Sequence, residues 1–181
     1  MSTRCQIMFH WGEDETAVSA LLYRHSDGYP DTEHGVLADL DKFFDDLDKN
    51  LADKRYSDPC YLAAKLLVWF VAEYQNRYFD MYKEMASMSK TGDDYAEKKL
   101  EEFGHPCDFL GHGIDMCLHG DIEYLYHIHC NEGWGGERPK VTWERVTKEV
   151  QKRYEHLAKA ANKKVKIPAG AIQEGRPEEV Q

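Results

Sequence analysis

The chain lacks the short signatures that identify common catalytic chemistries. It has no Gly-x-Ser-x-Gly elbow, Walker loop, dinucleotide fingerprint, Cys-x-x-Cys knuckle or His-Glu-x-x-His pair. A Gly-rich run, Gly133 to Gly136, precedes no strand-to-helix phosphate cradle and is interpreted as an ordinary loop. No single motif therefore assigns an activity, and whether the protein is an enzyme stays open.

Basic residues are in deficit. The chain has 23 Lys and Arg against 33 Asp and Glu, a formal net charge of −10. A surface of that sign disfavours direct binding to nucleic acid or to anionic membranes. It favours a protein partner with a basic surface.

Long apolar runs and paired cysteines are also missing. The most apolar stretch, around Leu66 to Ala72, is too short to cross a bilayer. Five cysteines are scattered without a repeated spacing, and the first residues do not resemble a signal peptide. The prediction is a cytoplasmic protein with no disulfide framework and no cofactor.

The composition is that of a folded domain. Hydrophobic residues make up 42% and charged residues 31% of 181 residues, enough for one domain with its own core. Residues 1–163 are predicted to form that domain, and residues 164–181 a mobile tail or arm, because periodicity is weak there.

Two strands are expected near the N-terminus. Residues 4–11 alternate between two faces, and residues 18–25 read as a second strand. The first face carries Cys5, Ile7, Phe9 and Trp11, and the second carries Arg4, Gln6, Met8 and His10. An antiparallel hairpin with its loop centred on Asp14 would place Arg4 opposite Arg24. The two cations would repel unless an acid or an anionic ligand lay between them.

After the two predicted strands, apolar residues recur at helical spacing. Residues 36–51 predict an amphipathic helix with a buried stripe and a very acidic outer face. Ser57-Asp58-Pro59 is a start signal for a long helix over 60–85, whose apolar first half, with Trp69, predicts a buried central helix. A short exposed helix over 95–103 follows.

The last part of the domain predicts more strands and a final helix. Residues 114–119 and 122–130 flank Gly120-Asp121, a two-residue hairpin turn, and residues 143–161 have helical spacing. The fold class is therefore a single α+β domain: an antiparallel sheet of about four strands, packed by a long buried helix and two amphipathic helices.

The run from Arg24 to Pro30 is the first candidate site. Asp27-Gly28 is a strong turn dipeptide with positive φ expected at Gly28, and Pro30 stops the strand, so the segment is predicted to be a rigid corner. One interpretation is structural, with the polar groups bracing the corner. The alternative is a small-molecule or nucleotide site, or a hydrolase, in which arginine holds an anion and His25 acts as acid or base. The hypothesised ligand-binding residues are Arg4, Arg24, His25, Asp27 and Tyr29.

The acidic helix is the second candidate. A run of aspartates is often only a solvated face, but it also suits a basic macromolecular partner. The hypothesised partner-binding residues are Asp39, Asp45 and Asp46.

The histidines and cysteines between 105 and 130 are not predicted to bind a metal. Histidines and cysteines gather between 105 and 130, and His127 and His129 share a strand face. Without a ligand spacing typical of zinc, these side chains are expected to satisfy local hydrogen bonds. The set comprises His105, Cys107, His112, Cys117, His119, His127, His129 and Cys130.

Four segments together resemble a family of small uncharacterised bacterial and bacteriophage proteins with a His-x-Asp-Gly-Tyr-Pro motif. They are Thr3-Arg4-Cys5, Leu22 to Pro30, Asp58 to Ala63 and Asp121 to Tyr126. The resemblance spans about Arg4 to Cys130, and Ser26 stands where many members carry Trp. It implies one domain and no particular activity, and it makes a phage-encoded, host-directed or anti-defence role conceivable.

The sequence leaves two candidate functions. The favoured one is a non-enzymatic interaction protein that binds a macromolecular partner through its acidic helix face, because no catalytic signature is complete. The alternative is the small-molecule site at the corner. The oligomeric state cannot be inferred from these patterns.

Overall fold

The computed structural model describes residues 3–31, 33–50, 54–102, 111–131 and 137–157. They form a single α+β domain around one mixed, five-stranded sheet with the strand order β3-β2-β1-β4-β5. The strands are β1 (Cys5–Trp11), β2 (Val18–Arg24), β3 (His112–Ile114), β4 (Tyr124–Cys130) and β5 (Lys140–Arg145). The predicted tail, 164–181, lies outside the described residues.

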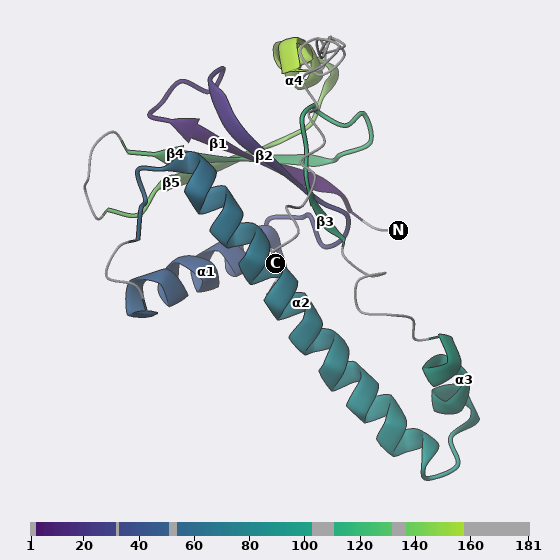
Figure 1. The fold of residues 1–181 in the computed structure, drawn as a ribbon. Coiled ribbons are helices and arrows are strands. Elements are labelled where there is room, and N and C mark those ends of the chain that lie inside the picture. The colour runs from purple at the N-terminus through teal and green to yellow at the C-terminus, as the bar shows by residue number, and fades with distance from the viewer. Residues whose placement is uncertain (1–2, 32, 51–53, 103–110, 132–136, 158–181) are drawn as a thin grey trace, which may run out of the picture.

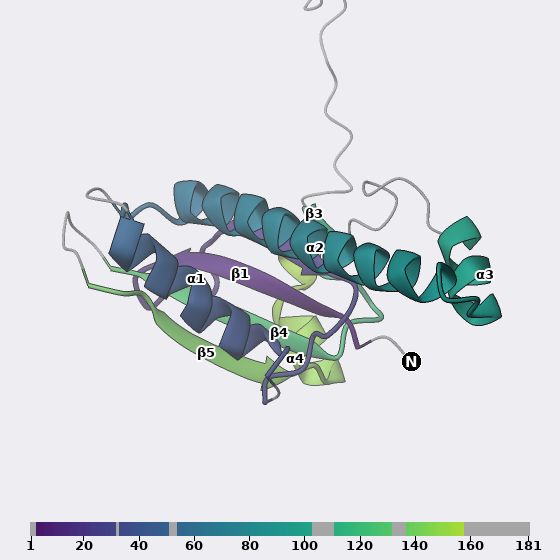
Figure 2. The same cartoon turned by 90° about the horizontal axis from the view of Figure 1, so that it is seen from below.

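Helices cover both faces of the sheet. They are α1 (Val36–Asn50), α2 (Pro59–Ser89), α3 (Asp94–Glu102) and α4 (Lys148–Arg153). Helices α1 and α2 lie on one face and the short α4 on the other (Figures 1 and 2). Among the helices of the described residues, none is both long enough and apolar enough to cross a membrane.

The central strands supply two cores, as their alternation predicted. Cys5, Ile7 and Phe9 point towards α1 and α2, where they join Tyr126 and Ile128 of β4. Met8 of β1 and Leu125 of β4 point the other way and pack with Val150 and Tyr154 around α4. Helices and apolar side chains therefore cover both faces of the central strands.

The hairpin predicted for 114–130 is wrong. Strand β3 pairs with β2, whereas β4 lies parallel to β1 with Cys5 beside Tyr124. Residues 115–123 form a loop between two strands on opposite sides of the β1–β2 hairpin. Tyr23 of β2 and its partner Gly113 of β3 are 90 residues apart, and Cys5 of β1 and Tyr124 of β4 are 119 apart, so a local turn signal could not reveal these pairings.

The sheet has five strands rather than about four, because residues 140–145 form β5 along β4. The sequence assigned Trp143 to the last helix, but that helix begins only at Lys148, where Thr147 accepts a hydrogen bond from the Val150 N–H. Val141 and Trp143 have the spacing of a strand, whereas Trp143 and Val146 have that of a helix, and sheet pairing decides between the two.

Helix α2 begins as predicted. Asp58 is its N-cap and accepts from the Tyr61 N–H at 2.9 Å, with Pro59 in the first turn. Its 31 residues extend roughly 46 Å at 1.5 Å per residue. A seven-residue strand spans only about 23 Å. The second half of α2 therefore projects beyond the sheet, with α3 beside its far end (Figure 1).

The prediction that α2 is buried all round is wrong for its outer side. Val68 is 68% exposed and Tyr61 41% exposed. Trp69 is half-buried against the core rather than enclosed by it, and its indole N–H donates to Asp46 at 2.9 Å. No further layer covers this side of the helix within the residues described.

Candidate functional site

The corner at residues 24–30 is held by Arg24. Its side chain is buried and uses all three nitrogens: Nε donates to the Ser26 carbonyl at 2.8 Å, Nη2 to the His34 carbonyl at 3.1 Å, and Nη1 to Asp39. The guanidinium also lies 5.3 Å from the centre of the Phe70 ring. These contacts are what the bracing interpretation of the corner expects.

The turn itself differs from the prediction. Asp27, not Gly28, takes the positive φ, at 54°. Gly28 is required for another reason: a Cβ there would lie 2.9 Å from the main chain of Arg4 and Cys5. The Tyr29 hydroxyl donates to Asp27 at 3.1 Å, and Tyr126 donates to the Gly28 carbonyl at 2.8 Å.

Arg4 does not join Arg24. The register pairs Cys5 with Arg24, so the predicted Arg4–Arg24 pairing is wrong by one residue. A bulge between Phe9 and His10 causes the shift. Arg4 lies on the opposite face and forms an ion pair with Asp121 in the loop before β4.

His25 also points away from Arg24. It is exposed, and its Nδ1 lies 3.1 Å from the hydroxyl of Tyr23. Arg4 and Arg24 thus lie on opposite faces of the sheet, whereas Arg24 and Asp27 line the same small cavity.

A small cavity lies behind the corner. Its volume is about 30 Å³, and its walls include Arg24, Asp39, Arg77 and His112. His112 stacks on Phe70 with ring centres 4.7 Å apart, and burial lowers its pKa to about 4. The cavity has room for about one or two waters. A pocket for a nucleotide usually measures about 300–1,000 Å³, so the geometry gives this function little support.

The acidic helix divides into buried and exposed members. Asp39 is buried between Arg24 and Arg77, so the prediction that it lies on the outer face is wrong. Asp45 is exposed and pairs with Arg138 at 2.5 Å, which lowers the pKa of this carboxyl. Asp46 is exposed and accepts from Trp69.

An apolar groove lies between α1 and α2. It is open to solvent, and its volume is about 480 Å³. The residues that line it are Phe43, Leu47, Tyr61, Ala64, Lys65, Val68, Trp69 and Ala72. Of these, the sequence predicted Phe43, Leu47, Val68 and Trp69 as apolar core positions, because helical spacing does not say whether another layer covers them.

Three histidines form a buried layer on the α4 face. His10 lies between His127 and His129, with both pairs of ring centres 5.2 Å apart and stacked. His10 Nε2 and His127 Nδ1 are 3.0 Å apart, and His127 Nε2 lies 3.2 Å from Glu144. Stacked rings do not converge on a metal. The predicted shared face of His127 and His129 is confirmed, and the hydrogen bonds agree with a structural role.

Only part of the predicted His and Cys set can be placed. His105 and Cys107 lie outside the described residues, and Cys130 and His112 lie on the face of α1 and α2. Among the residues described, one group brings three metal-ligating side chains together, namely Asp115, Cys117 and His119. Asp115 was not among the predicted residues, although Asp115, Cys117 and His119 recur at every second position of the sequence.

No protein-family model, curated protein or solved structure matches this chain. The resemblance to bacterial and bacteriophage proteins therefore stays a prediction from the sequence motifs.

Proposed function

We propose that this protein is a non-enzymatic interaction protein that binds another protein through the groove between α1 and α2. The occupant is an amphipathic helix whose apolar side fills the groove and whose polar side carries basic residues. The groove itself carries the proposal, because it presents one continuous apolar surface to solvent.

The exposed residues of the groove support a binding role. Single exposed apolar residues are ordinary, whereas a contiguous apolar patch marks an interaction site. Val68 and Tyr61 are exposed on the same side of α2, and the Trp69 ring meets Phe43 of α1 at 6.0 Å across the groove floor. Grooves of this kind accept the i, i+3, i+4 and i+7 side chains of a helix.

Exposed carboxylates on α1 near the groove favour a basic partner. Asp46 lies at the groove because Trp69, which lines it, donates to its carboxylate. Asp41 adds exposed negative charge on α1, whereas Arg138 offsets the charge of Asp45, and the whole chain has a net charge of −10. A basic partner would be attracted before contact, and salt would weaken that attraction.

The resemblance to phage-encoded proteins suggests where such a partner occurs. We propose a protein of a bacterial host, which would make this chain a host-directed or anti-defence factor. This part of the proposal depends on the sequence motifs alone.

Two variants of equal charge change test the groove. Val68→Arg places a cation in the groove, and Ile114→Arg places one on β3, where Ile114 is 77% exposed. Each variant is titrated with an amphipathic peptide of Leu and Lys and with its Leu and Glu counterpart. We expect the Lys peptide to bind the wild type and Ile114→Arg, and Val68→Arg to lose that binding.

The same three proteins are then immobilised in bacterial lysate, and captured proteins are compared by mass spectrometry. A host protein retained by the wild type and Ile114→Arg, and lost with Val68→Arg, would identify the partner. Equal binding of the Lys peptide by both variants would show general charge attraction and would refute the groove.

A further inference from the structure

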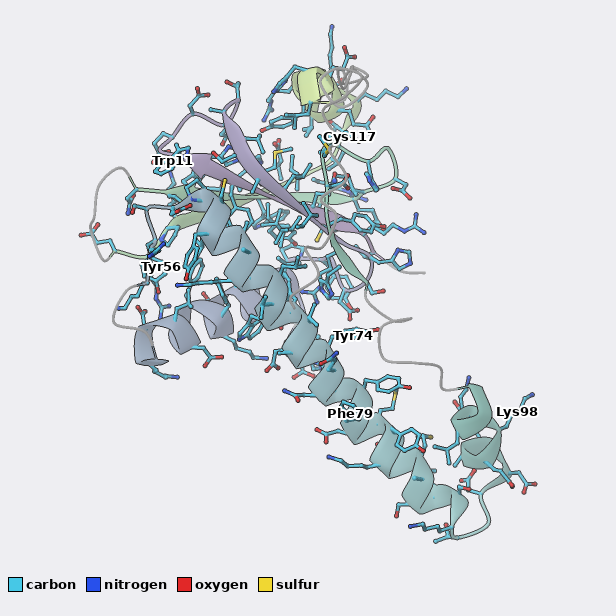
Figure 3. The ribbon with its side chains drawn as sticks, viewed as in Figure 1. Trp11, Tyr56, Tyr74, Phe79, Lys98 and Cys117 are labelled. Carbon is cyan, nitrogen blue, oxygen red and sulfur yellow. The ribbon has the colours of Figure 1, made fainter. Side chains whose placement is uncertain are left out.

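The loop between β3 and β4 brings three different metal-ligating groups together. A carboxylate oxygen of Asp115, the Cys117 sulfur and a ring nitrogen of His119 all lie within 4.8 Å of one another. Residues 115–119 follow β3 as an irregular loop that bends at Met116 and Cys117, and this bend folds the three side chains together. Figure 3 labels Cys117 on the side of the sheet where α4 lies, away from the groove.

A buried glutamine fixes the loop. Gln6 of β1 is 0% exposed, and its Nε2 donates to both the Asp115 carboxylate and the Cys117 carbonyl at 2.9 Å. Its Oε1 accepts from the His119 N–H at 2.9 Å. One side chain therefore positions all three residues, as the outer groups around a metal site do.

A second carboxylate stands behind the imidazole. Asp121 Oδ1 lies 4.0 Å from His119 Nδ1, while His119 Nε2 lies 2.6 Å from Asp115. Asp121 is itself held by Arg4. A carboxylate hydrogen-bonded to the far nitrogen of a ligating histidine orients the ring and makes the other nitrogen a stronger ligand. A movement of about 1 Å would bring Asp121 within hydrogen-bond distance of Nδ1.

We propose that Asp115, Cys117 and His119 bind one zinc ion through a carboxylate oxygen, a thiolate sulfur and the His119 Nε2. Oxygen, sulfur and nitrogen are the ligand types that zinc takes in proteins. Metal–ligand bonds of about 2.1 Å in a tetrahedron put neighbouring ligand atoms about 3.4 Å apart. The Asp115–His119 contact of 2.6 Å would then open by less than 1 Å.

Three protein ligands leave the fourth position of a tetrahedral ion for water. Asp115 is mostly buried and His119 is 38% exposed, so the site is reachable from solvent on the imidazole side. The Tyr23 ring lies 4.8 Å from the His119 ring and limits its rotation. Zinc coordination of this kind is open rather than fully closed by protein.

Cobalt reports on the site directly. The full-length protein, purified without metal and kept reduced, is titrated with Co²⁺ and then with Zn²⁺. We expect one Co²⁺ per chain, with a thiolate-to-cobalt charge-transfer band and tetrahedral visible bands, both removed by Zn²⁺. The charge-transfer band requires a sulfur ligand, so the histidine layer around His10 cannot produce it.

Matched cysteine variants locate the sulfur. Cys117→Ser should abolish the band, and Cys60→Ser, which changes an exposed thiol outside the cluster, should retain it. Asp121→Asn should weaken metal affinity by about 10–100-fold, as for other outer-shell partners. Circular dichroism checks that each variant is folded.

Thiol labelling tests the wild type without any substitution. Bound Zn²⁺ should slow maleimide modification of Cys117 and leave the rate at Cys60 unchanged, read by peptide mass spectrometry. Absence of stoichiometric metal, a band that survives Cys117→Ser, or equal protection of both cysteines would overturn the zinc site. None of these outcomes depends on the groove between α1 and α2.

Discussion

Arg24 and Asp39 form an ion pair 2.7 Å long in which the two side chains are only 5% and 3% exposed. It joins the end of β2 to the first turn of α1, and so fixes the corner between them. Arg77 of α2 is a second partner of Asp39 at 3.1 Å, with its own side chain 41% exposed.

Asp39→Asn should strongly destabilise the fold. The change leaves the Arg24 charge buried without its counter-ion, and breaking a buried pair in this way costs about 3–5 kcal/mol. Urea denaturation measures the free energy of unfolding. Asp41→Asn, an exposed acid on the same helix, is the control and should change it by less than about 0.5 kcal/mol.

Replacing both charged residues by apolar ones tests whether the loss of stability comes from an unpaired buried charge. Arg24→Met combined with Asp39→Leu should recover most of the stability that Asp39→Asn loses, because no unpaired charge remains. Arg77→Ala should lower the free energy of unfolding by less than Asp39→Asn does, because the Arg77 side chain is partly solvated. An Asp39→Asn protein as stable as the wild type would show that the pair does not brace the corner.

Gly28→Ala should destabilise the protein by about 1–3 kcal/mol, a usual cost of overpacking. The added methyl would lie 2.9 Å from main-chain atoms of Arg4 and Cys5, which cannot rotate away. Gly120→Ala is the matched control, because a Cβ at Gly120 meets nothing within 4 Å. Thermal melts of the two variants should therefore differ, and equal melting temperatures would contradict the close approach.

Local patterns predicted the faces of the central strands but not their neighbours. The alternation around Ile7 and Ile128 was enough to assign each side chain to a face, because a strand has a period of two. That β4 lies parallel to β1 depends on pairing across more than 100 residues. No turn signal encodes such a pairing.

The placement of several candidate-site residues could not be predicted, for related reasons. A one-residue bulge moved Arg4 to the face opposite Arg24, as a change of register does to every side chain beyond it. Asp39 was indistinguishable from its exposed neighbours until Arg24 was placed beside it. Asp115 and Gln6 are 109 residues apart, so the braced loop is visible only in three dimensions.

Stability should fall with acid because of the buried histidines. Burial, reinforced by the neighbouring rings, lowers the pKa of His10 to about 4, and burial lowers that of His127 to about 4, both from 6.5. Above pH 6.5 these rings are neutral in the folded and unfolded chains and contribute no pH dependence. Between pH 6.5 and about 4 the unfolded chain binds protons that the folded chain refuses, so acid favours unfolding. Below about 4 the folded rings are protonated too, and their contribution levels off.

The measurement is the free energy of unfolding at pH 5.0 to 7.0. Each histidine adds a slope of up to about 1.4 kcal/mol per pH unit in this range, so His127→Gln should give a shallower profile whatever its stability at neutral pH. His34→Gln is the control, because this side chain is 61% exposed and lies outside the buried histidine layer. A wild-type profile that is flat over this range, or one whose slope His127→Gln leaves unchanged, would show that the buried histidine layer titrates like free imidazole.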